Sequence, residues 1–347
     1  GLMLGLNFNH LFQGVSDSIG GSDKGGITTD MDLVGSWELI NRGKPTAGKV
    51  VFGLEGRWDY GTTGPQEIGF ANLGSIIGTA NAFSRYTPTF LLRNLYYEMG
   101  SPEAGWGFRV GKITPDAMLA TSRHITPLTT FLPNGGTGFF SSGYPDSGVG
   151  LAGAWRPTDD IRILGIVSDA RGNRFNFGNP GAGDYYTALE FGARIAPKTD
   201  QAGYSKLTFW RIPETGMAIN GATGEEGWGM TVKHEHEFTE DGRAVGVFRW
   251  GRSWDDASVY KQQAGAHFLY YDPGLISEVR NDVIGTAFNW VKANDTARDE
   301  YNFEVFYRFP FFPGVDTTVS YQSVFDPAFN TEFDHAHVLS FRVRTTF

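Results

Sequence analysis

The sequence predicts an all-β fold: a transmembrane antiparallel β-barrel of about sixteen strands. Three observations predict it. Apolar and polar residues alternate along segments of about ten residues, aromatic side chains recur near the ends of these segments, and the connections between them are alternately short and long. A strand with lipid on one side and water on the other needs one apolar and one polar face. We expect residues 1–347 to form one barrel domain.

Composition favours strands over helices as the membrane-crossing elements. The 347 residues include 47 Gly, 28 Phe, 14 Tyr and 9 Trp, and only 19% are charged. No segment approaches the roughly 18 to 20 consecutive apolar residues that a membrane helix requires. The lack of Cys excludes disulfides and thiolate metal sites, and a net charge of -9 argues against a nucleic-acid partner. Because Gly1 to Asn9 has no basic segment followed by an apolar core, we expect a mature form after processing.

The alternation can be followed along the whole chain, and Leu2 to Phe12 already has the pattern of a first strand. The clearest later strands are Val51 to Tyr60, Tyr185 to Ile195, Trp228 to Glu235, Tyr301 to Arg308 and His337 to Phe347. In the last of these, Leu339 and Phe341 lie on the apolar face and Arg342 on the other. A soluble β-sandwich would also alternate, but its core would favour Val, Ile and Leu. Phe, Tyr and Trp recur near these strand ends instead, as in the aromatic girdles of membrane barrels.

The connections fall into two classes that alternate along the chain. The short ones are Asn41 to Gly48, Gly100 to Gly105, Pro157 to Asp160, Ala196 to Gly203 and Thr239 to Gly242. The long ones are Gly61 to Tyr86, Thr114 to Asp146, Ala170 to Asp184 and Ile212 to Gly227. Bacterial barrels have tight periplasmic turns and longer extracellular loops. An even number of strands would then place both chain ends in the periplasm.

Several short segments follow one another along the chain in the same order as in a known protein family. They are Asn94-Leu-Tyr-Tyr-Glu98, Phe108-Arg-Val-Gly-Lys112, Gly246-Val-Phe-Arg-Trp-Gly251, Ala264-Gly-Ala266, Arg280 to Trp290, Glu304-Val-Phe-Tyr-Arg308, Pro313-Gly-Val315, Val319 to Ser323, Asp326-Pro327 and Leu339 to Phe347. Together they resemble the OprB-type carbohydrate-selective porins over much of Arg93 to Phe347. That family also has an N-terminal portion ahead of its barrel, which we do not identify here because Leu2 to Phe12 is predicted to be the first strand.

The resemblance implies a sixteen-stranded channel of the bacterial outer membrane through which monosaccharides or small oligosaccharides diffuse passively. The alternatives are a porin with an anion or cation bias and no sugar preference, and an outer-membrane barrel enzyme or adhesin. We expect the lipid bilayer and small hydrophilic solutes as partners, and a homo-oligomer is also compatible with the sequence. The closing aromatic, Phe347, resembles the signal read by the barrel-assembly machinery.

Passage of a sugar requires side chains that exchange hydrogen bonds with hydroxyl groups and still release the solute. The candidates for lining the pore or contacting the substrate are Glu55, Arg57, Asp59, Asn94, Glu98, Arg109, Glu190, Arg194, Lys233, Glu235, Glu304 and Arg308. We expect several of the arginines to face carboxylates across the lumen and to set up a transverse field. Arg109 is the strongest single candidate, because it combines an inward phase with a family-like context. The alternative is that these charges only fill a wet interior.

The longest connection, Thr114 to Asp146, exceeds thirty residues, and loops beyond about 12 to 15 residues are usually functional or disordered. We expect it to fold into the barrel and to set the pore width. Its candidate constriction residues are Arg123, His124, Phe131, Asn134, Phe139 and Phe140. The alternative is a surface loop that packs on its neighbours or on another protomer.

Three enzyme-like patterns are present, and none of them predicts an enzyme. Gly148 to Gly153 fits G-x-G-x-x-G but lacks the strand and helix that flank a dinucleotide site, so we expect a Gly-rich strand. His234 and His236 share a strand face without an obvious third ligand, which favours a solvated rim over a metal site. The serines, aspartates and 7 His could supply a Ser/His/Asp hydrolase, but no G-x-S-x-G elbow identifies a nucleophilic serine. We therefore expect no enzyme activity, no cofactor and no metal.

Overall fold

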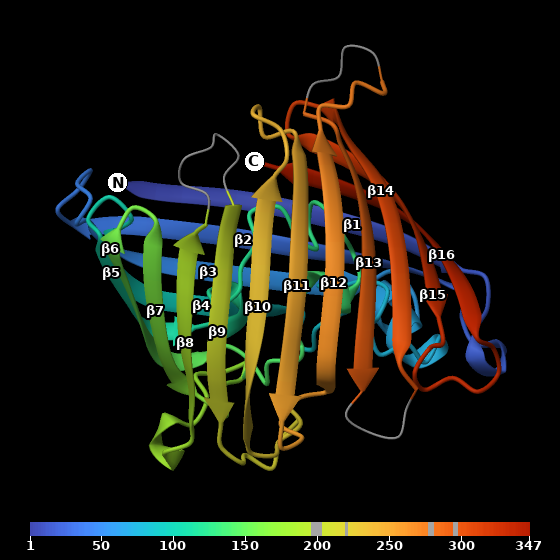
Figure 1. Cartoon of the computed structure of the whole chain (residues 1–347), viewed down its shortest axis with the longest axis horizontal. Coiled ribbons are helices and arrows are strands. Elements are labelled where there is room, and N and C mark those ends of the chain that lie inside the picture. Colours follow the sequence, from blue (N-terminus) through green and yellow to red (C-terminus); the bar gives the residue numbers. More distant parts are fainter. Residues whose placement is uncertain (196–202, 219–220, 277–280, 294–297) are drawn as a thin grey trace.

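The computed structural model describes residues 1–195, 203–218, 221–276, 281–293 and 298–347. Within these residues, sixteen strands form one closed antiparallel barrel, in which each strand pairs with its sequence neighbours and β1 pairs with β16 (Figure 1). The predicted fold class is thereby confirmed. The first eight strands are β1 (Leu2–Val15), β2 (Gly25–Ile40), β3 (Gly48–Asp59), β4 (Phe90–Ser101), β5 (Trp106–Ile113), β6 (Gly148–Thr158), β7 (Ile161–Asp169) and β8 (Tyr185–Arg194). The others are β9 (Gly203–Ile212), β10 (Gly227–Glu237), β11 (Ala244–Trp254), β12 (Tyr260–Tyr271), β13 (Val283–Ala293), β14 (Glu300–Phe312), β15 (Val315–Phe325) and β16 (His335–Thr346).

Helical turns are few and short in the part of the chain that the structure describes. They are η1 (Ile19–Gly21), α1 (Pro65–Glu67), η2 (Ile68–Asn72), η3 (Pro115–Ala117), α2 (Asn134–Thr137) and η4 (Pro180–Ala182). None of the described helices is long and apolar enough to cross a membrane. The Gly-rich segment from Gly148 to Gly153 lies in β6, so the strand predicted in place of a dinucleotide loop is confirmed.

The two faces of the sheet differ as the alternation predicts. Leu151, Phe248 and Phe288 point outward and are about half exposed (52, 51 and 48%), whereas Lys233 and Arg342 point inward and are 1% exposed. Outward apolar side chains of this kind recur on almost every strand. Soluble monomers rarely expose contiguous apolar patches of more than a few hundred Å². A belt around the whole barrel therefore fits contact with hydrocarbon.

Aromatic pairs border this belt at both ends. Trp228 and Trp254 stack across β10 and β11 with ring centroids 4.2 Å apart. Trp106 and Trp155 pair across β5 and β6 at the opposite end of the barrel. Rings at these levels match the interfacial girdles of membrane barrels.

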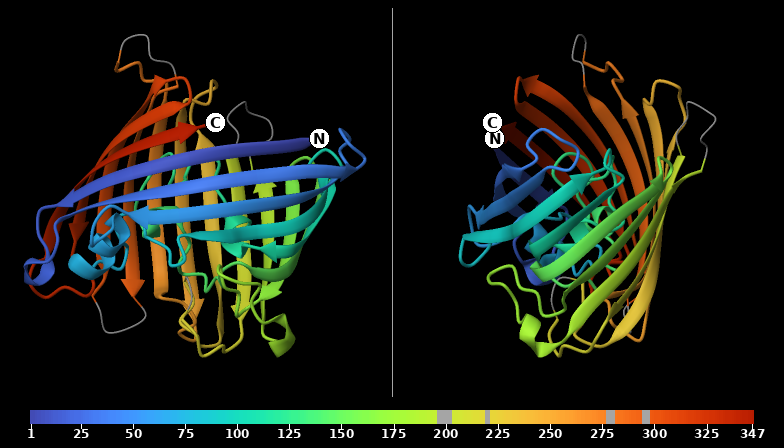
Figure 2. Two further views of the ribbon diagram at one scale, coloured as in Figure 1. Left: turned by 180° about the vertical axis from the view of Figure 1, so that it is seen from behind. Right: turned by 90° about the vertical axis from the view of Figure 1, so that its left-hand side faces the viewer.

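The two barrel rims differ in the length of their connections. The predicted short connections between β2 and β3, β4 and β5, β6 and β7, and β10 and β11 all lie on one rim, here called the turn rim. Both chain termini lie on this rim too (Figure 2). Of the predicted short connection Ala196 to Gly203, residues 196–202 lie outside the described residues. The four predicted long connections lie on the other rim, here called the loop rim.

Two of the long connections turn inward and fill much of the barrel: the loop at 60–89, between β3 and β4, and the loop at 114–147, between β5 and β6 (Figures 1 and 2). Ile68, Leu73 and Phe83 of the first loop are fully buried, and so is Phe131 of the second. These side chains form small apolar clusters with inward residues of the wall, such as Val324 beside Ile68 and Leu73. The barrel interior is therefore neither empty nor a continuous dry core.

Candidate functional site

Inward side chains of β14 and β16 hold the middle of the loop at 114–147. Both carboxylate oxygens of Glu304 accept hydrogen bonds from the backbone N–H of Leu132 (3.2 and 3.0 Å). Arg342 donates to the carbonyl oxygens of Pro127 (2.6 Å) and Thr130 (3.1 Å). Because these partners are backbone groups, the contacts position the loop itself.

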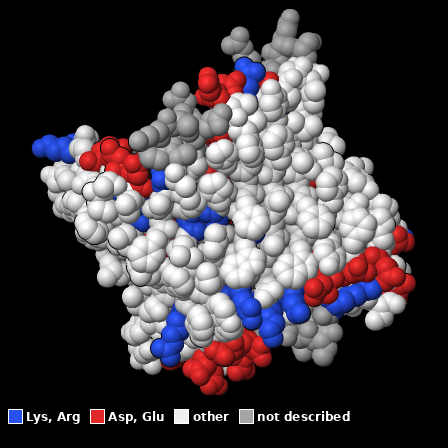
Figure 3. Space-filling model, viewed as in Figure 1, with Lys and Arg blue, Asp and Glu red and all other residues white. Residues whose placement is uncertain are grey.

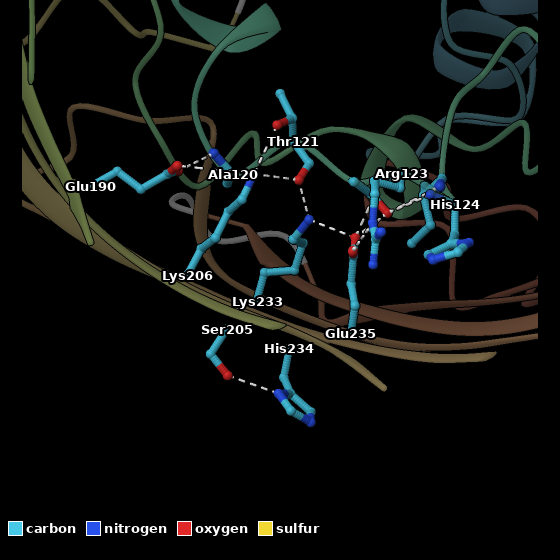
Figure 4. Close-up of polar contacts among 12 residues, drawn as sticks. Ala120, Thr121, Arg123, His124, Glu190, Ser205, Lys206, Lys233, His234 and Glu235 are labelled. Carbon is cyan, nitrogen blue, oxygen red and sulfur yellow. Dashed lines mark hydrogen bonds and ion pairs between the residues drawn. The ribbon is translucent and has the colours of Figure 1, made fainter. Parts of the chain in front are cut away.

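The beginning of the same loop is held from β8, β9 and β10 (Figure 4). Glu190, Lys206, Lys233 and Glu235 point from the sheet into the interior toward this segment. The Lys206 ammonium donates to the Thr121 carbonyl (2.7 Å), and Lys233 donates to that carbonyl and to Glu235 (2.7 Å). Glu190 accepts a hydrogen bond from the backbone N–H of Ala120. This cluster therefore pairs opposite charges and fastens the loop with them.

The loop at 60–89 has its own anchor in Glu300, which is fully buried. The Glu300 carboxylate accepts hydrogen bonds from the backbone N–H groups of Ile76 (2.8 Å), Ile77 (3.2 Å) and Ala328 (2.8 Å), and from the Ser75 hydroxyl. A buried carboxylate is costly unless it is hydrogen-bonded, and these donors meet that need. The loop at 60–89 is thus anchored on Glu300 of β14.

A cavity of about 1050 Å³ remains between the two inward loops and the wall. Its lining includes Arg57, Tyr86, Arg93, Asn94, Asp116, Asn134, Phe139, Phe140, Tyr144, Arg174, Arg249 and Tyr260. The lining also reaches residues of the loop rim, such as Thr223 and Asp256, and residues deeper in the barrel, such as Pro127 and Leu128. This cavity is the candidate site.

One wall of the cavity is a ladder of arginines and carboxylates. Arg57 pairs with Asp30 (2.6 Å) and with Glu55, and Arg93 pairs with Asp146 (3.1 Å). The carboxylate oxygens of Asp30, Asp32 and Glu55 lie within 4.8 Å of one another. The Arg57 guanidinium lies among them and offsets their charge.

The same wall continues with Asp146 and Tyr86, which belong to the two inward loops. Arg174 pairs with Asp146 and donates to the Tyr86 hydroxyl (3.0 Å). The Tyr86 ring lies against Arg57 and Arg174, with 4.6 and 5.2 Å from guanidinium carbon to ring centroid. Burial opposes ionisation of Asp146, but Arg93 and Arg174 outweigh it and hold the pKa of this carboxyl below its usual range. Asp146 is therefore ionised at neutral pH.

The facing wall comes from the end of the loop at 114–147 and from β11. Arg249 donates to the carbonyl oxygens of Gly136 and Gly138 (2.6 Å for the latter) and lies 4.2 Å from the Phe139 ring centroid. Gly136 packs so tightly on β13 that a Cβ there would approach the Asn289 amide nitrogen to 2.9 Å. The loop thus presents Phe139 and Phe140 to the cavity.

The candidates from the sequence fall into three groups and two separate positions. Arg57, Asn94, Asn134, Phe139 and Phe140 line the cavity, and Glu55 lies directly behind Arg57. Glu190, Lys233, Glu235, Glu304 and Arg308 contact the inward loop. Glu98 and Arg109 pair at 2.8 Å in a second cavity of about 490 Å³ near the turn rim. Asp59 accepts a hydrogen bond from Thr28, and Arg194 pairs with Asp160 in a turn (3.6 Å).

The remaining candidates of the loop lie apart from the arginine ladder. Arg123 is 65% exposed and reaches Glu237 (3.5 Å). His124 Nδ1 lies 2.8 Å from the Tyr271 hydroxyl, and burial lowers the pKa of His124. Phe131 of the loop packs against the barrel wall, edge-on to Phe306 of β14 (centroids 4.9 Å apart).

Sequence reasoning missed Arg93, Arg174, Tyr86, Asp146 and Arg249 as lining or supporting residues. Arg249 could have been found, since it has the inward phase in β11. Arg93 could not, because a register shift in the β3–β4 pairing turns both Arg93 and Asn94 toward the cavity. The other three belong to loops or loop ends, where alternation gives no signal.

A closed sixteen-stranded barrel with a polar cavity between inward loops defines a porin-type barrel. No family model and no curated protein matches the sequence. The chain is similar in structure to Pseudomonas putida OprB at high pH (TM-score 0.80, 13% identity, 100% of this chain and 94% of that one). It is also similar to the same protein at low pH (TM-score 0.62, 11% identity, 100 and 93% covered) and to a mutant of Rh. blastica porin (0.56, 13%, 100 and 100%). The resemblance to OprB that the sequence predicts is thus confirmed at the level of the fold.

Proposed function

We propose that this chain is a porin of the bacterial outer membrane that lets small hydrophilic solutes diffuse passively, with carbohydrates as the leading class of solute. The observation that carries the proposal is the cavity of about 1050 Å³ inside a barrel whose outer face is apolar. A protein of this kind needs water on the inside and hydrocarbon on the outside.

The chemistry of the cavity supports a sugar as the solute. Sugars present hydroxyl groups around an apolar ring face, and such sites combine aromatic surfaces with a few polar groups. Phe139 and Phe140 supply rings on one wall, and Arg57, Arg93 and Asn94 supply hydrogen-bonding groups on the other. In this proposal the paired charges set up the transverse field, and the solute exchanges one hydrogen bond at a time as it moves.

A porin without sugar preference and with an anion bias is the second candidate. Four arginines line the cavity, namely Arg57, Arg93, Arg174 and Arg249. Only the first three have carboxylate partners among the described residues. Asp116, Glu225 and Asp256 line the same cavity, so an anion bias would rest on Arg249, the one of these four arginines without a carboxylate partner among the described residues.

Liposome swelling separates these two candidates. Proteoliposomes are diluted into isotonic glucose, a disaccharide, arginine or succinate, and the swelling rates are compared. The sugar porin predicts that glucose enters faster than either charged solute, whereas the anion-biased porin predicts that succinate is fastest. No swelling with any solute, in liposomes where the barrel is fully inserted, would contradict both.

Two further partners belong to this proposal: the barrel-assembly machinery and other copies of the chain. The terminal strand β16 ends one residue before Phe347, whose ring packs against Phe8 of β1 (centroids 6.4 Å apart). We propose that the barrel-assembly machinery reads this end before β1 and β16 pair. A homo-oligomer stays a prediction.

A further inference from the structure

Four basic side chains lie on the outer face of the barrel along neighbouring strands, close to the loop rim. They are Arg211 of β9, Arg252 of β11, Lys261 of β12 and Lys292 of β13. Figure 3 shows Lys and Arg gathered along the lower edge of the uncharged outer surface, over the lower ends of these strands. We call these four residues the outer basic row.

The sheet register places members of the row side by side. Gln262 of β12 pairs with Arg252 on one side and with Lys292 on the other. Two strand spacings, about 9 to 10 Å, therefore separate these two backbone positions. A register shift between Tyr260 and Gln262 leaves Lys261 exposed between them. The bulge adds a third cation to the same level of the barrel.

Among the residues that the structure describes, no carboxylate oxygen lies within 4.0 Å of a side-chain nitrogen of the row. Other arginines near the loop rim are paired: Arg171 with Asp184 (2.6 Å), and Arg298 with Asp334 (2.5 Å). Arg252 instead lies over the ring of Trp254, 5.1 Å from its centroid. The positive charge of the row is thus available to a ligand.

The height of the row on the barrel identifies the kind of ligand. Arg211 pairs across the ladder with Trp228, which stacks on Trp254, so the cations lie at the level of the aromatic girdle. Lipid headgroups begin where such a girdle lies. Basic residues at this depth contact phosphate-bearing headgroups.

The loops beyond the row make a lipid a better fit than a dissolved anion. Exposed carboxylates follow directly on the loop side, at Glu225, Glu226, Asp255 and Asp256. A dissolved anion that approached from the water would be repelled by these groups. A phosphate carried by a lipid reaches the row from the membrane side and avoids these four carboxylates. On that side, Asp299 accepts a hydrogen bond from the Trp290 indole (3.1 Å).

We propose that the outer basic row binds the phosphate groups of a phosphate-bearing lipid in the leaflet at the loop rim. The inference rests on the proposed function, since it requires the barrel to lie in an outer membrane with the loop rim outward. Its chemistry is that of paired cations on phosphate oxygens, with Arg252 and Lys292 as the two ends of the contact and Lys261 between them.

The test compares two variants that each remove three positive charges. The first, R252Q/K261Q/K292Q, removes most of the row. The matched control, R42Q/K44Q/R243Q, removes exposed cations from two connections of the turn rim. The probes are lipid A carrying two phosphates, the same lipid without phosphates, and inorganic phosphate. Binding to the detergent-solubilised barrel is measured by native mass spectrometry.

The expected result is that the row variant loses affinity for phosphorylated lipid A by about a hundredfold, since each basic residue near an anionic lipid surface contributes roughly fivefold. The control variant should bind as the wild type does, and inorganic phosphate at equal concentration should not compete. Equal binding by both variants, equal binding of the dephosphorylated lipid, or full competition by inorganic phosphate would each overturn the proposal.

Conductance in planar bilayers separates this proposal from the proposed function. If the wild type conducts and yet shows no preference for phosphorylated lipid, only the lipid proposal fails. If it binds the lipid through the row and forms no channel, the porin proposal fails and the lipid site stands. Heat-modified gel migration shows whether each variant has closed its barrel.

Discussion

At the scale of single residues, inward charge serves two different purposes in this barrel. Glu304, Lys233 and Arg342 bind loop backbone, whereas Arg57 and Arg93 face the cavity. Strand alternation predicts that such side chains point inward, and it predicts this correctly. It cannot separate the two purposes, because the difference depends on which loop segment lies opposite each side chain.

Removal of Arg174 should shift the ion preference of the channel. We expect R174Q to lower the permeability for anions relative to cations by about two- to fivefold, because a partly exposed charge interaction contributes roughly 0.5 to 1 kcal/mol. Arg93 still pairs with Asp146 in this variant, so the wall is retained. Reversal potentials in a salt gradient measure the effect.

R109Q is the matched comparison for R174Q. Arg109 is 41% exposed and lies with Glu98 in the turn-rim cavity, so its removal should have a smaller effect. A larger shift for R109Q than for R174Q would place the narrow part of the pore near the turn rim and contradict the assignment of the site.

At the scale of the elements, the strands and rims could be predicted from sequence, and the paths of the loops could only partly be predicted. Alternation and turn residues determine where strands begin and end, as β3 and β8 illustrate. The length of the loop at 114–147 predicts its inward fold. The sequence does not predict the inward path of the loop at 60–89, because its anchor is Glu300, far away in the sequence.

Loss of an anchor should loosen one loop and leave the barrel closed. Glu304→Leu removes the acceptor for the Leu132 N–H, and a hydrogen bond to a charged group contributes roughly 1.5 to 3 kcal/mol. We expect limited proteolysis within residues 114–147 to become at least about tenfold faster, since local opening follows this free energy. E332Q, which changes an exposed carboxylate in another loop, is the control. Equal cleavage rates in the two variants would exclude Glu304 as an anchor.

Shortening the loop should widen the channel. Deletion of Pro133 to Ser142 removes α2 and the aromatic wall of the cavity, so single-channel conductance should rise. Deletion of Pro180 to Ala182, an exposed turn on the same rim, should leave conductance unchanged. If the longer deletion also leaves the single-channel value unchanged, the loop does not form the constriction.

At the scale of the whole molecule, closure of the sheet between β1 and β16 makes the barrel one unit. Phe12 pairs with Phe341 across this seam, and Asn9 pairs with Arg344. The sequence predicts closure because an open edge would leave backbone groups unpaired in hydrocarbon. It does not predict the residual cavity, which depends on how two loops pack against each other and against the wall.

Removal of the final aromatic should impair assembly more than stability. We expect F347Q to reduce the amount of heat-modifiable barrel in the outer membrane several-fold, because the assembly machinery would no longer read the closing aromatic. The stability of the assembled barrel should change little, since Phe347 is 76% exposed and touches Phe8 only edge-on. F329A, which changes an exposed aromatic of a loop, should have no such effect. Normal membrane levels of F347Q would argue against recognition of the C-terminal aromatic by the barrel-assembly machinery.

A porin-type barrel requires water at the inner face of its wall and lipid at the outer face. The natural chain has no Cys, so single cysteines can report on each face. Asn81 lines the cavity, and Leu151 points outward from β6. In reconstituted membranes, a charged, water-soluble maleimide should label N81C and not L151C. Labelling of L151C with protection of N81C would contradict the account.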